Sequence, residues 1–456
     1  MKRLLAIIVT AMLILTACAQ ENTPEVEPQP EPNQPVFDEP LQSISEQTDA
    51  TEPIITSSTD PAATTVDTTG GDNAPISSSE TKPTSETKST ESTTVTTSAP
   101  ATVVESAIRV GRNTLCSGGE LYIDMEQRLN FIDFTSMKSA LLCSKPNCSH
   151  KDPSVCSAFG MTNCPFIYDR NIYFFESGIT NDGGKAEYYT NIIRADIDGT
   201  SRKTRQKLKG VFKMEGTEAI VVGDTIYFIA EKSGFTEFGI PEDFKENYLC
   251  SYNFKKNDYT EIAKICEGYS VGSYIRGVYN GGIYLFCTYL EEFFDMNAAL
   301  MEATGGDMSN IGGVDIASIR PEFISRMYCY DVKSKKITEC DNSIGVGIGY
   351  MTENNGNKQT LYCENGSVYD ISDISQINDI INNKLIDIAD NIIVDLNTEK
   401  RHKLLTDNFD GDFAQIIYSI GGEYIVRVNQ RDEHGRNIGY RYEKVTEDKV
   451  VGAEMS

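Results

Sequence analysis

The sequence is poor in the groups from which many catalytic sites are built. Its 456 residues include no tryptophan and only three histidines, His150, His402 and His434. His402 lies in a basic turn and His434 in a polar hairpin, where we expect both imidazoles to be solvated. No P-loop is present, so the sequence lacks that phosphate-binding signature. A cysteine–histidine nucleophile would have to use His150, whose neighbouring cysteines suit metal ligation better than catalysis.

Basic residues are also scarce. The chain has 41 lysines and arginines against 67 acids, for a formal charge of -26. Residues 19–105 and residues 106–456 each carry a net charge of -14. Nucleic acids and anionic lipid surfaces both require basic patches on their partners. We therefore exclude nucleic acid as a partner, together with peripheral binding to anionic lipid.

Long apolar runs are missing apart from one at the N-terminus. Leu4 to Leu15 is an apolar run of 12 residues broken only by Thr10, and Met1-Lys2-Arg3 before it is basic. This run is too short for a membrane span and suits a secretory signal. It ends in Leu15-Thr16-Ala17-Cys18, which resembles the bacterial lipobox. We predict that residues 1–17 are a lipoprotein signal peptide and that Cys18 receives diacylglycerol. The chain is then exported and anchored to the outer face of the cytoplasmic membrane, at the cell surface.

Aromatic residues are almost absent from the segment that follows Cys18. Residues 19–105 contain 11 of the 16 prolines but only one of the 42 aromatic residues, Phe37. They are rich first in proline and glutamate and then in serine and threonine. Such a composition cannot offset chain entropy by burial. We predict that residues 18–105 are a lipidated cysteine followed by a disordered linker.

A strand motif recurs through residues 106–456. Each copy pairs a strand that follows a glycine or asparagine turn with a second strand that ends in an acid or asparagine. The second strands end at Asp133, Asp196, Asn253, Asp331, Asp395 and Glu443. The mean step of about 62 residues suits a four-stranded blade with its loops. We predict an all-β fold, a β-propeller of six blades, or seven if a degenerate repeat escapes the pattern. A pair of generic β-sandwiches is the alternative fold, but it would not require six similar units.

One interval between repeats is unusually long. Residues 291–318 begin with a helix-prone segment and continue in a glycine-rich loop. We predict an insertion between two strands of one blade.

The cysteines divide into a cluster and a dispersed set. Cys143, Cys148, His150 and Cys156 form a C-x4-C-x-H-x5-C pattern, with Cys164 eight residues further on. Three thiolates and an imidazole could close a structural zinc site. Disulfides among Cys143, Cys148, Cys156 and Cys164 are the alternative, since exported chains favour them. The two interpretations remain open at this point.

The cysteine-rich loop also carries a resemblance. Residues Leu142–His150 and Cys156–Phe159, together with the tyrosine-rich strands, resemble uncharacterised β-propeller-type surface lipoproteins of Gram-positive gut anaerobes. The resemblance covers residues 106–456. It implies a lipid-anchored surface propeller and no particular activity.

These observations predict a cell-surface binding module without catalysis. Its membrane contact is the lipid on Cys18, its ligand is a glycan, a protein or another surface ligand, and we expect a monomer. The alternative is a carbohydrate-active enzyme, glycosidase-like, with a carboxylate pair at the propeller centre.

Overall fold

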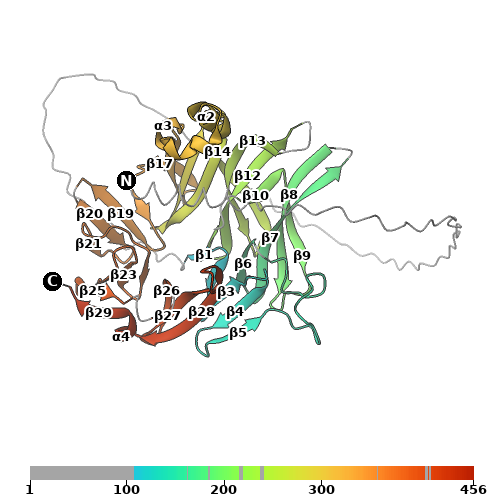
Figure 1. The fold of residues 1–456 in the computed structure, drawn as a ribbon. Coiled ribbons are helices and arrows are strands. Elements are labelled where there is room, and N and C mark those ends of the chain that lie inside the picture. Colours follow the sequence, from blue (N-terminus) through green and yellow to red (C-terminus); the bar gives the residue numbers. More distant parts are fainter. Residues whose placement is uncertain are drawn as a thin grey trace, which may run out of the picture. The chain divides into compact units, whose positions relative to one another are not determined.

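The computed structural model describes residues 107–455, apart from 162, 183–184, 215–218, 237–240, 357, 406–408 and 410–411. The predicted signal peptide, Cys18 and the predicted linker lie outside the described residues. The described chain is almost wholly β-structure (Figure 1). None of its helices is both long enough and apolar enough to cross a membrane. The all-β prediction is confirmed.

Antiparallel hairpins arrange these strands into seven sheets, numbered here in chain order. The first sheet consists of β2 (Asn113–Cys116), β3 (Gly119–Ile123), β4 (Leu129–Asp133) and β5 (Lys138–Leu141). The second consists of β6 (Asn163–Tyr168), β7 (Asn171–Asp182), β8 (Lys185–Asp196) and β9 (Lys203–Lys209).

The third sheet consists of β10 (Val211–Met214), β11 (Ala219–Val222), β12 (Thr225–Phe235), β13 (Pro241–Asn253) and β14 (Asp258–Tyr279), together with β1 (Ile108–Val110). The fourth consists of β14, β15 (Gly282–Leu290), β16 (Ile324–Asp331) and β17 (Lys336–Cys340).

The last three sheets follow the same plan. The fifth consists of β18 (Gly345–Val346), β19 (Tyr350–Asn355), β20 (Lys358–Cys363) and β21 (Val368–Asp370). The sixth consists of β22 (Asp379–Ile381), β23 (Lys384–Asp387), β24 (Ile392–Asp395), β25 (Lys400–Leu404) and β29 (Val451–Glu454). The seventh consists of β26 (Asp412–Ile420), β27 (Glu423–Arg431) and β28 (Asn437–Thr446), after which α4 (Glu447–Val450) leads into β29.

The long strand β14 belongs to two sheets. Its first part, Asp258–Gly268, pairs with β13, and its second part, Tyr269–Tyr279, pairs with β15. The register shifts after Tyr269, where the strand leaves one sheet and enters the next. The third and fourth sheets are therefore two separate blades that share one strand.

Strand β12 shows why the sheets stack on one another. Its side chains alternate, because successive residues of a strand point to opposite faces. Ile226, Phe228 and Ala230 pack against the second sheet. Tyr227 and Ile229 pack against the fourth sheet. Both faces of this sheet are thus buried, which explains the nearly continuous apolar sequence of the strand.

Contacts between successive sheets close into a cycle. Apolar clusters join the first sheet to the second, the second to the third, the third to the fourth, the fifth to the sixth and the sixth to the seventh. The fourth and fifth sheets meet through the backbone, where Val278 N donates to the Gly347 oxygen at 2.9 Å. Ile132 and Phe134 of the first sheet and its following turn pack with Ile417 and Ile425 of the seventh. The fold is a β-propeller, as predicted, and the described sheets number seven, the larger of the two counts that the sequence allowed.

The additional sheet is the fifth, β18–β21. Val368 and Tyr369 follow the turn at Asn365-Gly366 and so fit the first strand of the repeat that ends at Asp395, but they lie in the last strand of this sheet. Its longest strands carry few apolar residues, and only Thr352 and Leu361 are buried in them. A strand with so few apolar side chains gives almost no period-two signal, so the repeat pattern passed over it.

Two short strands occupy positions that the repeat pattern does not predict. β1 pairs with β11, and Arg109 donates from Nη1 to the Ile275 carbonyl oxygen at 3.3 Å. β1 also contacts β2 and β6, so it lies among the first strands of several blades. β29 adds to the edge of the sixth sheet beside β25, although it follows the seventh in sequence. The first described strand thus lies at the centre of the cycle.

Helical structure interrupts the fourth sheet between β15 and β16. This segment contains α2 (Met296–Ala303), η1 (Met308–Gly313) and α3 (Ile316–Ile319). Asp295 caps α2 by accepting hydrogen bonds from the backbone of Asn297 and Ala298. No residue of α2 or α3 is buried, so this segment adds surface to the blade and contributes little to its core.

Candidate metal centre and binding cavity

The predicted metal ligands lie in the loop between β5 and β6, which connects the first sheet to the second. Asn147 and His150 adopt left-handed backbone conformations, with φ of 59° and 57°. Asparagine and histidine tolerate this region better than most residues. The two turns fold the loop back on itself, so that cysteines distant along the loop face each other.

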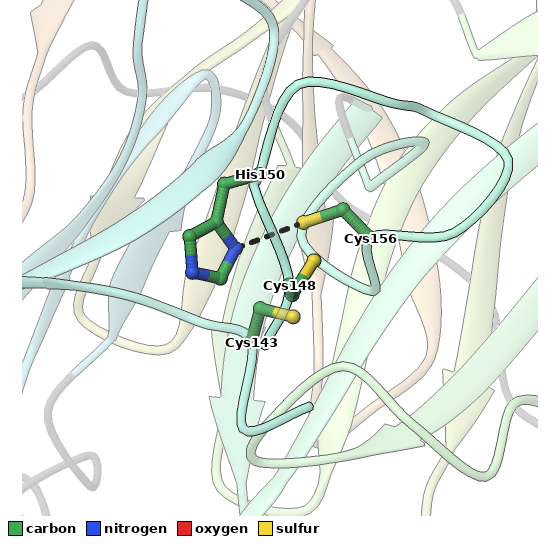
Figure 2. Close-up of side chains that lie close together, drawn as sticks. All are labelled: Cys143, Cys148, His150 and Cys156. Carbon is green, nitrogen blue, oxygen red and sulfur yellow. Dashed lines mark hydrogen bonds between the residues drawn. The ribbon is translucent and has the colours of Figure 1, made fainter. Parts of the chain in front are cut away.

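The four predicted ligand residues come together. Figure 2 shows the side chains of Cys143, Cys148, His150 and Cys156 close together. One donor atom from each of them lies within 4.8 Å of the other three. Nδ1 of His150 is 3.5 Å from Sγ of Cys156. A tetrahedral zinc, with bonds of about 2.0 Å to nitrogen and 2.3 Å to sulfur, would hold such a pair at about 3.5 Å. The cluster therefore has the donors and the spacing to bind a metal ion.

Two of the thiols differ in acidity. Burial raises the pKa of the Cys143 thiol, but hydrogen bonds from Ser157 and from the backbone of Lys145 outweigh it and lower this pKa to about 6. Burial raises the pKa of Cys156 to about 11, and its contacts with Cys143 and Cys148 act in the same direction. One thiolate thus forms readily within the cluster, and thiolates are the form in which cysteine binds metals.

The second half of the loop is fixed to both neighbouring sheets. Leu129 N in β4 donates to the Ala158 oxygen at 2.9 Å. On the other side, Arg202 Nη2 donates to the Ser157 and Phe159 carbonyl oxygens, both at 2.6 Å. Gly199 in the same turn has φ of 75°, and a Cβ there would lie 2.4 Å from the Ser157 oxygen. Only glycine allows this approach, so the loop is held between the first two blades.

Of the four cysteines of the disulfide alternative, three belong to the cluster and only Cys164 lies apart. Cys143, Cys148 and Cys156 carry thiols. Cys164 lies outside the cluster of four, in β6, and is buried in the apolar core between the second and third sheets. The arrangement brings together the predicted metal ligands and leaves Cys164 in the core.

A cavity of about 530 Å³ lies where the second and third sheets meet. Sequence reasoning did not predict it. It is lined from the second sheet and its turns by Tyr168, Asp169, Asn171, Tyr173, Arg194 and Arg205, and from the turns of the third sheet by Asp224, Phe254 and Lys255. Its volume falls within the range that small-molecule sites occupy, about 300–1,000 Å³.

Aromatic rings form one part of the cavity wall. The ring centroid of Phe254 is 4.4 Å from that of Tyr168 and 4.9 Å from that of Tyr173. Such aromatic groups bury a large flat surface and fix one another's orientation. The wall therefore offers a rigid apolar face beside polar groups.

The cavity lining also contains an ion pair. Lys255 Nζ lies 2.7 Å from an Asp224 carboxylate oxygen, and the Tyr168 hydroxyl donates to the same carboxylate. Hydrogen bonds from Lys255 and then Tyr168 lower the pKa of Asp224. Asp224 is thus ionised and already satisfied by residues of the protein.

The centre of the cycle carries a different arrangement. Burial raises the pKa of Asp379 in β22, and the positive charge of Arg109 in β1 opposes this rise. The pKa of Tyr350 is raised by burial and by the charge of Asp379. Asp379 thus lies near a positive charge, and the carboxylate pair of the glycosidase-like alternative stays a prediction.

A serine motif that sequence reasoning missed lies in β14. Gly268-Tyr269-Ser270-Val271-Gly272 matches G-x-S-x-G, and Ser270 is exposed with φ of 49°. In hydrolases this motif forms a turn from a strand into a helix, whereas here it lies inside one strand. The ring of His150 hydrogen-bonds Cys156, and that of His402 hydrogen-bonds the Gly452 oxygen. His434 lies beside Glu433. The three histidines thus have these other partners within the described residues.

No family model and no curated protein matches the sequence. Solved structures with a similar arrangement include the acylaminoacyl peptidase of Pyrococcus horikoshii, at 10% identity and a TM-score of 0.35, covering 76% of this chain and 52% of that one. An oligogalacturonate lyase in complex with manganese matches at 8% identity and a TM-score of 0.31, covering 74% of this chain and 77% of that one. TolB from Acinetobacter baumannii matches at 10% identity and a TM-score of 0.25, covering 76% of this chain and 65% of that one. This chain spans about half the length of the peptidase. The propeller assignment rests on the cycle of sheets, and we transfer no activity from these proteins.

Proposed function

We propose that residues 106–456 form a ligand-binding module and that the cavity between the second and third sheets is its binding site. The observation that carries this proposal is the lining of the cavity, where aromatic rings adjoin charged groups of both signs. Binding pockets combine an apolar wall with a few placed polar groups in this way. At the centre of the cycle, β1 pairs with β11, and the charge of Arg109 acts on the buried Asp379.

The module is proposed to be displayed on the cell surface through its N-terminus. The sequence supports this, since a signal-like apolar run ends in Leu15-Thr16-Ala17-Cys18. Two acyl chains on one cysteine give stable anchoring. Replacing Cys18 with alanine should shift the protein from the membrane fraction to the soluble fraction. The mass of the mature parent chain should show a diacylglyceryl group on Cys18, and a parent chain that retains Met1 would contradict the anchor.

The cysteine cluster is proposed to hold a structural zinc. Four protein donors fill a tetrahedral coordination sphere, so no position remains open for a substrate. The loop contacts both the first and the second sheet, and a metal within it would fasten two blades together. The zinc thus supports the scaffold beside which the cavity forms.

The binding function can be tested with a screen of the full chain, solubilised in detergent, against small acids, sugars and peptides. Ligand-observed NMR detects weak binding in such mixtures. At least one compound should bind, and its binding should fall when the cavity is altered at Tyr168. A screen without any binder, or a binder indifferent to the cavity, would contradict the proposed site.

A further inference from the structure

Two arginines of the cavity have no acid as a partner. Nε of Arg194 donates to the Asn171 side chain at 2.8 Å. Arg205 lies within hydrogen-bonding reach of the Tyr252 hydroxyl, and its own Nε is buried without a hydrogen-bond partner. Within the described part of the chain, neither guanidinium forms a salt bridge. Lys255, by contrast, is already paired with Asp224.

The lack of an acidic partner for these two arginines is unusual because the domain is rich in acids. Residues 106–456 carry a net charge of -14, yet the cations lining the cavity outnumber its acids by three to two. A carboxylate in the cavity would supply the acidic partner that the two guanidinium groups lack among the described residues. The excess of positive charge in the cavity lining would attract such an anion.

The charge and shape of the cavity limit the anion that it suits. The excess of one positive charge matches a single negative charge, and a guanidinium presents paired donors that fit a carboxylate. The rings of Tyr168 and Phe254 lie 4.4 Å apart at their centroids. They provide an apolar surface on which a flat group can pack.

We propose, building on the proposed function of the cavity, that its ligand is a small carboxylate with a flat apolar face, either an acidic sugar or an aromatic acid. The carboxylate binds between Arg194 and Arg205. The flat face packs on Tyr168 and Phe254. Asp169, which also lines the cavity, is available to accept hydrogen bonds from hydroxyl groups of a sugar.

The test compares two acids with their uncharged counterparts on the full chain. Glucuronate and phenylacetate represent the two sources of the carboxylate, and glucose and phenylacetamide lack the charge. We expect one of the two acids to bind and its uncharged counterpart to bind at least about tenfold more weakly, as the loss of a charge-assisted hydrogen bond implies. Which acid binds distinguishes a sugar from an aromatic acid.

Substitutions in the cavity locate the charge. Arg205→Gln and Arg194→Gln should each weaken binding of the acid about tenfold. Arg436→Gln, at an exposed arginine in the turn between β27 and β28, should leave it unchanged. Circular dichroism verifies that each variant is folded. Three results would overturn the proposal that the ligand is a carboxylate. They are equal binding of the acid and its uncharged counterpart, unchanged binding of the acid by Arg205→Gln, and no binding of either acid. If neutral compounds still bind and their binding is weakened by a substitution at Tyr168, the cavity is a binding site but its ligand is not a carboxylate.

Discussion

Replacing Cys148 with serine should abolish zinc binding and destabilise the fold. We expect the parent chain, purified under reducing conditions, to contain one zinc ion per molecule and the variant to contain almost none. A ligand present at a thousand times its dissociation constant stabilises the native state by about 4 kcal/mol. The free energy of unfolding should fall by a similar amount, because the metal joins a loop that contacts the first and second sheets. Metal analysis and chemical denaturation measure the two effects.

The matched control is Cys340→Ser. Cys340 lies at the end of β17 and is not a member of the cluster of four. This variant should keep both the zinc and the stability of the parent chain. Absence of zinc from the parent, combined with a mass lower by two protons per bridge, would establish disulfides in place of the metal.

Replacing Glu120 with alanine should cost about 3–5 kcal/mol of stability, the range for breaking a buried ion pair. Glu120 in β3 bonds Arg427 in β27 at 2.9 Å, and the side chains are only 3% and 15% exposed. The pair joins the first sheet to the seventh, where the cycle closes. Loss of the carboxylate leaves a largely buried guanidinium without its partner. Denaturant titration of the single variant gives the cost directly.

A double substitution separates the pair from its individual charges. Burial raises the pKa of Glu120, and the charge of Arg427 only partly opposes this rise. The native state therefore holds the Glu120 proton more tightly than the unfolded state does, and ionisation of this carboxyl lowers stability as the pH increases. The variant Glu120→Leu/Arg427→Met should consequently be more stable than Glu120→Ala. As a control, Glu339→Ala breaks an exposed pair with Arg326 and should cost under about 1 kcal/mol. If Glu120→Ala were as stable as this control, the Glu120–Arg427 pair would not stabilise the contact between the first and seventh sheets.

The cluster of Cys143, Cys148, His150 and Cys156 could be predicted because its residues are close in sequence. All four lie within 14 residues, from Cys143 to Cys156, so spacing alone placed them in one loop. The sequence left a metal and disulfides both open, and it could not show that Cys164, one of the four cysteines of the disulfide alternative, lies outside the cluster. Its position in the core of the second and third sheets follows from blade packing.

The cavity could not be predicted because its residues meet only when two blades pack. Tyr168 and Phe254 are 86 residues apart in the sequence and lie at the ends of strands in different sheets. A signal existed in the equivalent turns before β7 and β12, where Asp169 and Asp224 precede tyrosine-containing strands. Residues at equivalent positions of adjacent blades lie near one another, so comparing these turns would have indicated a shared surface.

The most direct test of the account is the affinity of the strongest binder from the screen for three forms of the full chain. These are the parent, Tyr168→Ala and Tyr274→Ala. Tyr274 is an exposed aromatic residue of β14 outside the cavity lining and serves as the matched control. The account predicts that Tyr168→Ala weakens binding at least about tenfold, close to 1.4 kcal/mol, and that Tyr274→Ala leaves it unchanged. Equal affinity of the parent and Tyr168→Ala, with both folded, would show that the ligand binds elsewhere.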